Sequence, residues 1–242
     1  MSEWAMKRFW TEVSVQPETG GVAVRLDGRP VRTPAKALLL APNQAVAEKI
    51  AQEWDAQEKT VDPNTMPWTR TTNAAIDKVA VQRPEVTEHL ASYAGTDLLC
   101  YRADGPASLV ARQCETWDPI IERLQSEFGV KLNVTQGVMP VEQNCDDLSR
   151  LTSAMGDMTD FQLAGFHDLV TLSGSFALGL AVTRNWATPD QLWAASRLDE
   201  SWQIEQWGED EEASEAAQIK KVAFLHATEV YHLGGHSDQI SV

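Results

Sequence analysis

The side chains best suited to chemistry in this sequence are carboxylates placed among tryptophans near the C-terminal end. From Asp199 to Ile219 there are eight acidic residues and no lysine or arginine, and Trp202 and Trp207 lie within this run. Two carboxylates beside aromatic rings can supply the acid and the base that cleave a glycosidic bond. Adjacent residues on a helix point about 100° apart, so Asp199 and Glu200 do not flank one bond from the same face. An enzymatic site here needs a further residue that the sequence does not identify.

The histidines and cysteines give no stronger candidate. His232 and His236 have the i,i+4 spacing of a helical metal site, but Gly234 and Gly235 between them predict a non-helical segment. The three cysteines are widely separated and are most simply explained as small apolar residues. No glycine-rich phosphate loop and no nucleophile elbow is present in the sequence. We therefore expect no catalytic residue, no metal and no cofactor.

Charge and hydropathy limit the kinds of partner. The net charge is −15 and the isoelectric point is about 4.7, so the field of the protein repels nucleic acid and anionic membrane surfaces. The longest uncharged run, 169–183, has fifteen residues, which is short of the roughly 20 needed to span a bilayer. The first residues contain no apolar signal segment. The sequence thus predicts a soluble cytoplasmic protein that binds no nucleic acid and does not insert into membranes.

The first forty residues have the pattern of β-strands. Apolar and polar residues alternate over 9–15 and again over 22–26, which is the period of a strand. Asp27 and Gly28 suit the two left-handed positions of a type I′ turn and predict a tight hairpin. Helical spacing begins after Asn43, a good N-cap, and places Trp54 in the middle of an apolar stripe.

Beyond this region the pattern is mostly helical. Thr188, Pro189 and Gln191 form a helix-start signal, and we expect one continuous helix over 189–207, ended by Gly208. A final helix is expected to begin among 209–212 and to run to Tyr231. The sequence predicts an α+β protein with a small β-rich N-terminal domain containing antiparallel hairpins (1–90) and a larger all-helical C-terminal domain (91–242), with the boundary near 80–105.

The predicted 189–207 helix permits two interpretations. On a helical wheel Ala195, Leu198 and Trp202 share one face, which is expected to pack on the domain, while Trp193, Ile204 and Trp207 lie on another side. In the first interpretation the helix is buried on both sides and the acids are solvated at its edge. In the second, the aromatic side and the acids meet another protein, because tryptophan is a favoured interface anchor.

Several motifs resemble a known family, in the same order along nearly the whole chain. The family is that of the assembly chaperones of the ATP synthase catalytic head that handle the alpha subunit. The segments that carry this resemblance are 8–10, 24–34, 53–57, 66–67, 73–77, 97–103, 117–119, 198–203 and 207–208.

The resemblance implies a function and a site. Members of the family have a β-rich N-terminal domain and a helical one, and bind the free alpha subunit around its nucleotide-binding domain until the beta subunit replaces them. Eukaryotic members work in the mitochondrial matrix. The functionally important acidic position of the family falls on Asp199, with Glu200 beside it. We expect the partner-binding residues to be Trp193, Asp199, Glu200, Gln203, Glu205 and Trp207.

Two other functions remain open at this stage. One is a carbohydrate or small-molecule binding enzyme that uses tryptophans and carboxylates. The other is a structural adaptor for a different client protein. The chaperone hypothesis places the face of the helix around Asp199 and Glu200 on the alpha subunit.

Overall fold

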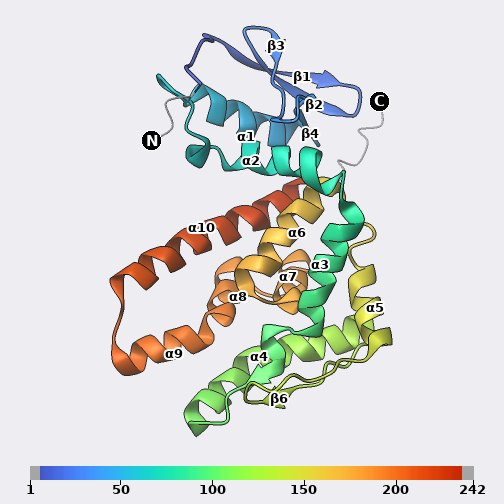
Figure 1. The fold of residues 1–242 in the computed structure, drawn as a ribbon, viewed down its shortest axis with the longest axis vertical. Helices are drawn as coiled ribbons and strands as arrows, with labels where there is room; N and C mark the ends of the chain where they lie inside the picture. The colour runs from blue at the N-terminus through green and yellow to red at the C-terminus, as the bar shows by residue number, and fades with distance from the viewer. Residues whose placement is uncertain (1–5, 236–242) are drawn as a thin grey trace. The chain divides into compact units, whose positions relative to one another are not determined.

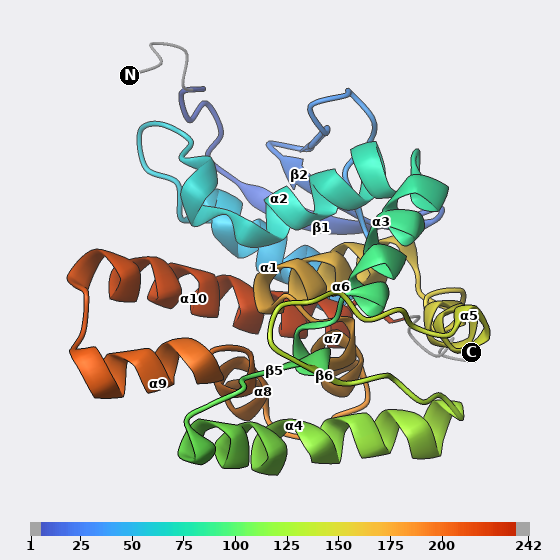
Figure 2. The same ribbon diagram turned by 60° about the horizontal axis from the view of Figure 1, so that its bottom comes forward.

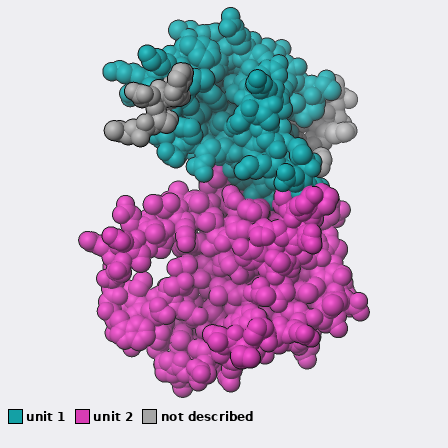
Figure 3. Space-filling model, in the orientation of Figure 1, with its two compact units in different colours: residues 1–83, 158–165, 230–242 teal, residues 84–157, 166–229 magenta. Residues whose placement is uncertain are grey.

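A computed structural model describes residues 6–235 and divides the chain into two compact units. The first unit is formed by segments 1–83, 158–165 and 230–242, and the second by segments 84–157 and 166–229 (Figure 3). The fold has the expected α+β character, with strands near the N-terminus and helices over most of the remaining chain (Figure 1).

The first unit contains an antiparallel sheet built on a long hairpin. Asp27 (φ 47°) and Gly28 (φ 75°) both adopt left-handed conformations, so the predicted tight turn is confirmed. The prediction that the first strand begins at residue 9 is wrong. The Asp27 carboxylate accepts hydrogen bonds from the backbone N–H groups of Thr11 and Glu12, at 3.0 and 2.9 Å, and this engages them outside the ladder. The strands are β1 (Val13–Glu18), β2 (Gly21–Leu26), β3 (Arg29–Pro30) and β4 (Leu40–Ala41).

Two helices of the first unit are joined by a half-buried carboxylate. Asn43 caps α1 (Gln44–Asp55) as predicted, and Trp54 is 8% exposed within its apolar stripe. Glu53 accepts hydrogen bonds from the N–H groups of Trp68 and Thr69 at the start of α2 (Pro67–Ala74), at 2.6 and 2.8 Å. Burial raises the pKa of Glu53 despite these bonds. These hydrogen bonds give Glu53 a structural role. The burial of Trp54 gives it the structural role that its position in the apolar stripe indicated.

Two later segments of the chain belong to the first unit. Arg83 pairs with Asp160 at 2.6 Å, and Asn43 donates to the carbonyl of Leu233 at 2.6 Å. The division between the units falls inside α6 (Asp160–Ser173) and inside α10 (Glu211–Leu233), so each of these helices contributes residues to both. The sequence predicts one continuous N-terminal domain up to residue 90; these returns are not visible in it, because local patterns do not show where a helix end packs.

The second unit is helical around a central apolar helix. In α7 (Phe176–Thr183) every residue from Phe176 to Val182 is buried, and Figures 1 and 2 place this helix among the others. Asp97 is fully buried and accepts hydrogen bonds from the Ser175 hydroxyl and from the N–H of Ala177 at the start of α7. The other helices and strands that lie wholly or partly in the second unit are α3 (Arg83–Gly95), β5 (Tyr101–Arg102), α4 (Ala107–Phe128), β6 (Thr135–Gln136), α5 (Cys145–Ser153), α6 (Asp160–Ser173), α8 (Pro189–Ser196), α9 (Leu198–Trp207) and α10 (Glu211–Leu233).

The expected continuous helix over 189–207 is two helices. The start at Thr188 is confirmed, with both hydrogen bonds of a capping box to Gln191. The chain leaves helical geometry at Arg197 (φ −110°, ψ 18°), whose N–H bonds to the carbonyl of Ala194 in a tightened last turn, while the Ser196 hydroxyl donates to the carbonyl of Trp193. These bonds end α8 and allow α9 to start in a new direction.

The remaining helix expectations concern the ends of α9 and α10. Gly208 ends α9 as predicted, and α10 begins at Glu211, within the expected range. His232 lies in the last turn of α10, which ends at Leu233, so Gly234 and Gly235 are non-helical as predicted, and His236 lies outside the described residues. In the part of the chain that the structure describes, no helix is both long enough and apolar enough to cross a membrane.

Candidate partner-binding site

Helix α9 carries most of the predicted site residues and is weakly embedded. Only Leu198 of its ten residues is buried, whereas α8 buries four of eight. Figure 2 shows α9 between α4 and the first half of α10. The helix therefore has one face toward α4 and one toward α10, and the two faces differ in chemistry.

The face toward α4 is held by polar contacts, here called the α4 clamp. The Gln113 amide donates to the Asp199 carboxylate at 2.7 Å, and the Gln113 side-chain oxygen accepts from the N–H of Ala103 at 2.9 Å. Arg112 donates two parallel hydrogen bonds to Glu205, at 2.7 and 2.9 Å. These bonds lower the pKa of Glu205 and raise that of Arg112. The clamp ties both ends of α9 to α4.

The clamp also has an aromatic contact and a buried member. The Arg112 guanidinium lies 5.0 Å from the centre of the Trp202 ring, a cation–π distance. Gln113 is 1% exposed, so loss of its partner would leave a buried amide unpaired. Leu198, Asp199, Trp202 and Glu205 thus share the face of α9 that meets α4.

The face toward α10 borders an open hollow of about 440 Å³, here called the α9–α10 groove. Trp193 lies at its base, 7% exposed and 5.5 Å from the Phe224 ring. Trp207 (79% exposed) and Ile204 (43% exposed) stand at its edge. The space-filling view shows unit 2 opened near the edge where Figure 1 places α9 and α10 (Figure 3). The residues lining the groove are Trp193, Arg197, Glu200, Ser201, Gln203, Ile204, Trp207, Gly208, Asp210, Ala213, Ser214 and Ala217.

The structure therefore divides the predicted site residues into two groups. Trp193, Glu200, Gln203 and Trp207 line the α9–α10 groove together. Asp199 and Glu205 face α4 and are engaged in the clamp. Sequence reasoning missed Arg112 and Gln113, because they precede their partners by 93 and 86 residues and no local pattern connects them. It also missed the small residues Ala213 and Ala217, which leave room for the groove.

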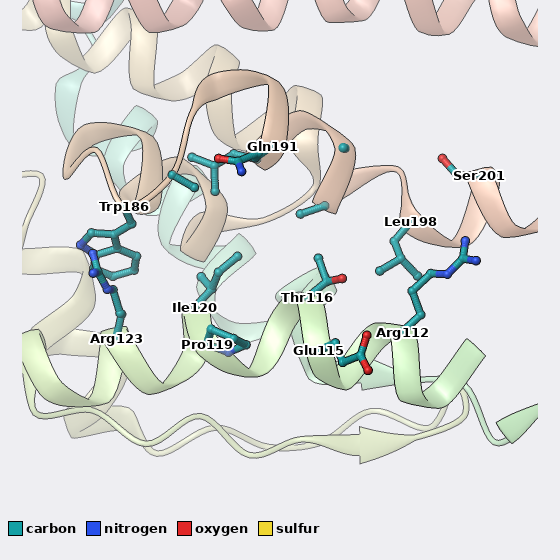
Figure 4. Close-up of a pocket in the computed structure, with 14 residues that line it drawn as sticks. Arg112, Glu115, Thr116, Pro119, Ile120, Arg123, Trp186, Gln191, Leu198 and Ser201 are labelled. Atoms are coloured by element: carbon teal, nitrogen blue, oxygen red, sulfur yellow. The ribbon is translucent and has the colours of Figure 1, made fainter. Parts of the chain in front are cut away.

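A second hollow of about 680 Å³ lies between α4 and α8, here called the α4–α8 groove. Figure 4 shows Arg123 beside the ring of Trp186 at one end and Arg112 near Leu198 at the other. Arg123 lies 5.9 Å from the centre of the Trp186 ring. Ser201 of α9 lines both grooves, so α9 separates them.

The carboxylates of α9 are not arranged as an acid–base pair. Asp199 is hydrogen-bonded to Gln113, and Glu200 pairs with Arg197 at 3.0 Å, on a different face. Within residues 6–235 no group of three or more His, Cys, Asp or Glu side chains is placed to hold a metal ion. Burial raises the pKa of the Cys100 thiol to about 12, which opposes formation of a thiolate. The arrangement offers apolar and acidic contact surface.

Comparison with known proteins gives consistent matches. The sequence model described as ATP12 chaperone protein matches residues 7–125. The crystal structure of Atp12 from Paracoccus denitrificans is 45% identical, with a TM-score of 0.91 over 95% of this chain and 99% of that one. A structure of an aspartate-to-lysine mutant of P. denitrificans Atp12p is also 45% identical, with a TM-score of 0.92 over 97% of this chain and 100% of that one.

A curated relative extends the match to a eukaryote. Protein atp12, mitochondrial, from Schizosaccharomyces pombe is 26% identical over 223 residues, which are 87% of this chain and 77% of the relative. The matches span both the strands and the helices described above, and at 45% identity they reach well beyond shared fold. The chain belongs to the ATP12 chaperone family, the ATP synthase assembly chaperones that its sequence motifs resemble.

Proposed function

We propose that this protein binds the free alpha subunit of F-type ATP synthase and keeps it soluble and unpaired until the beta subunit replaces it. The contact surface in this proposal is the α9–α10 groove with the exposed face of α9. The protein acts by binding and carries out no catalysis. We also expect it to work in the cytoplasm, whereas the S. pombe relative is named as mitochondrial.

The observation that carries the proposal is the exposure of large apolar side chains at the edge of the groove. Trp207 is 79% exposed and Ile204 is 43% exposed, on a helix whose opposite face is already fixed by the clamp. Apolar surface beside a hollow is typical of a protein interface, and tryptophan often dominates the binding free energy there. A partner that covers Trp207 and fills the groove removes this surface from water.

The charge around the groove supports a specific kind of partner surface. Glu200 and Asp210 line it together with Arg197, which pairs with Glu200, and the run from Asp199 to Ile219 adds further acids and no basic residue. Acidic side chains around an apolar centre favour a partner with basic residues around an apolar patch.

An enzymatic function is not favoured by the geometry. The carboxylates that would be needed as acid and base point to different faces of α9 and have separate partners. The α9–α10 groove is lined by Glu200 and Asp210 beside Trp193 and Trp207, but Glu200 is engaged by Arg197 at 3.0 Å and is not held as a free partner for a second carboxylate.

The proposal is tested with purified alpha subunit. Wild-type protein is expected to bind it, to suppress its light scattering on dilution, and to release it when beta subunit is added. Trp207→Ala is expected to weaken binding by about tenfold or more, as for a central aromatic anchor. The control is Val138→Ala, which alters an apolar side chain that is 92% exposed and lies outside both grooves. Wild-type protein that does not bind alpha subunit would overturn the proposal.

A further inference from the structure

The α4–α8 groove has a continuous apolar floor in a surface that is otherwise strongly charged. Ile120, Leu192, Ala195 and Leu198 line it, and each of these side chains is less than 10% exposed, so they form its base. Pro119 and Thr116 of α4 form one wall, as Figure 4 shows. A hollow of about 680 Å³ with such a floor is suited to receive apolar side chains of a bound segment.

An arginine lies at each end of the groove, although the chain has a net charge of −15, and Glu115 also lines the groove near Arg112 (Figure 4). At one end the Arg112 guanidinium is neutralised by two hydrogen bonds to Glu205. At the other end Arg123 is exposed and stacks on Trp186, and no carboxylate of the described residues forms an ion pair with it. Glu127, the acid that contacts Trp186, pairs instead with Arg184 at 3.1 Å. Arg123 therefore presents an unneutralised cation beside the apolar floor.

This combination specifies the chemistry of an occupant. Apolar side chains fit the floor, and a carboxylate a few residues away along the same segment fits Arg123. A basic side chain is disfavoured at the Arg123 end of the groove, because it would face an unpaired cation. The groove is also continuous with the proposed contact surface, since Ser201 of α9 borders both hollows. A client that covers α9 from the α10 side can therefore extend past Ser201 into the α4–α8 groove.

We propose that the α4–α8 groove binds an apolar segment of the alpha subunit that carries an aspartate or glutamate, with the carboxylate on Arg123. This inference rests on the proposed function and extends it: the client grips α9 from both sides. The α9–α10 groove receives the basic and apolar part of the client surface, and the α4–α8 groove receives the acidic and apolar part.

Two variants test the inference by measuring affinity for purified alpha subunit. Arg123→Glu places a negative charge where the carboxylate binds and is expected to weaken binding by about tenfold or more. Arg123→Lys keeps the charge and is expected to retain most of the affinity. The matched control is Arg29→Glu, the same charge reversal at an exposed position of the hairpin in the first unit. Ala194→Trp fills the groove from an exposed position of α8 and is expected to weaken binding without any change of charge.

A crosslinking measurement makes the result independent of small effects on folding. A photoreactive phenylalanine derivative at Thr116 of the full chain is expected to crosslink to an apolar segment of the alpha subunit next to an acidic residue. If Arg123→Glu and Ala194→Trp both bind the alpha subunit with the same affinity as the wild type, this inference is overturned and the α9–α10 groove remains as the proposed site. A wild-type protein that fails to bind alpha subunit would instead overturn the proposed function itself. Crosslinks to a basic segment would also contradict the inference.

Discussion

Asp199 and Glu200 are neighbours in the chain but have different surroundings. Asp199 binds the amide of Gln113, a residue that is 1% exposed, and Glu200 forms an exposed pair with Arg197. An isolated exposed ion pair contributes little to the free energy of unfolding, whereas a hydrogen bond to a buried amide contributes more. The acidic position singled out by the family resemblance therefore holds α9 against α4, and Glu200 lies on the groove that we propose as the contact surface.

Replacement of Asp199 by alanine is expected to destabilise the protein by about 1–3 kcal/mol, because the buried Gln113 amide loses its acceptor. Urea unfolding measures this change. Glu200→Ala is the control at the adjacent position and is expected to change the free energy of unfolding by less than about 1 kcal/mol.

A double-mutant cycle with Gln113→Ala sharpens the test. The two residues are in contact, so the losses in Asp199→Ala and Gln113→Ala are expected not to add in the double variant. Fully additive losses would show that Asp199 does not act through Gln113.

Glu53 gives a prediction about pH. Burial raises the pKa of Glu53 in the folded protein above its ordinary value of 4.5. The folded state then binds the proton more tightly than the unfolded state. The proton on Glu53 therefore adds to the free energy of unfolding. This contribution is complete below the ordinary pKa of a glutamate and is lost as pH rises through the pKa of Glu53 in the folded protein. Glu53→Gln cannot titrate, so wild type is expected to lose stability relative to this variant as pH rises through that window.

Denaturant unfolding of both proteins across a pH series measures the difference. Any constant offset from the altered hydrogen bonds to Trp68 and Thr69 is separate from this pH-dependent part. Glu58→Gln, at an exposed position, is the control. A difference between wild type and Glu53→Gln that stays constant with pH would contradict the prediction.

At the scale of elements, α8 and α9 are adjacent helices with unequal support. The four buried residues of α8 anchor it in the core, whereas α9 depends on Leu198 and the clamp. A helix with few buried apolar contacts opens at lower free energy than one in the core. Helix α9 is thus held mainly by a small set of side chains on α4.

Hydrogen exchange is expected to be faster at the amides of α9 than at those of α8. Arg112→Ala removes the pair with Glu205 and the contact with Trp202, so it is expected to increase exchange in α9 and leave α8 unchanged. Mass spectrometry of peptides from each helix provides the measurement. Equal protection of the two helices in the wild type would contradict the weaker support of α9, and unchanged exchange in α9 of Arg112→Ala would show that the clamp is not what holds it.

The sequence predicted element starts and ends where the determining groups are close in the chain. Thr188 and Gln191 form their capping box across three residues, and Asp27 with Gly28 sets the hairpin by itself. The break at Arg197 was not predictable in this way, because neither glycine nor proline marks it. It depends on a side-chain bond from Ser196 and on the packing of α8, which propensity does not show.

At the scale of the whole molecule, charge and long-range pairing determine what the chain can bind. The acids and tryptophans of the site were visible in the sequence, since they lie within one local segment. The α4 clamp and the α4–α8 groove were not, because they join α4 to residues more than sixty positions later. The sequence therefore pointed to the acidic, tryptophan-bearing helix, and it did not show the contacts with α4 that separate the residues of this helix into two groups.

The net charge of −15 leads to a prediction about the rate of binding. Association with a basic client surface is expected to slow by about tenfold or more when salt rises from about 0.05 to about 0.5 M, because ions screen the attraction. Trp207→Ala is expected to act mainly on dissociation. Stopped-flow fluorescence separates the two rates. An association rate that does not change with salt would contradict a steering role for the acids.

The return of residues 230–235 to the first unit has a consequence for how the protein is made. Leu233 accepts a hydrogen bond from Asn43, and Gly234 packs so closely that a Cβ there would lie 2.4 Å from the Phe161 ring. During translation the second unit is complete once residue 229 has left the ribosome, whereas the first unit still lacks these contacts. The unit that is synthesised first is thus the last to gain all its contacts. A nascent chain can expose a folded α9 before residues 230–235 have packed on the first unit.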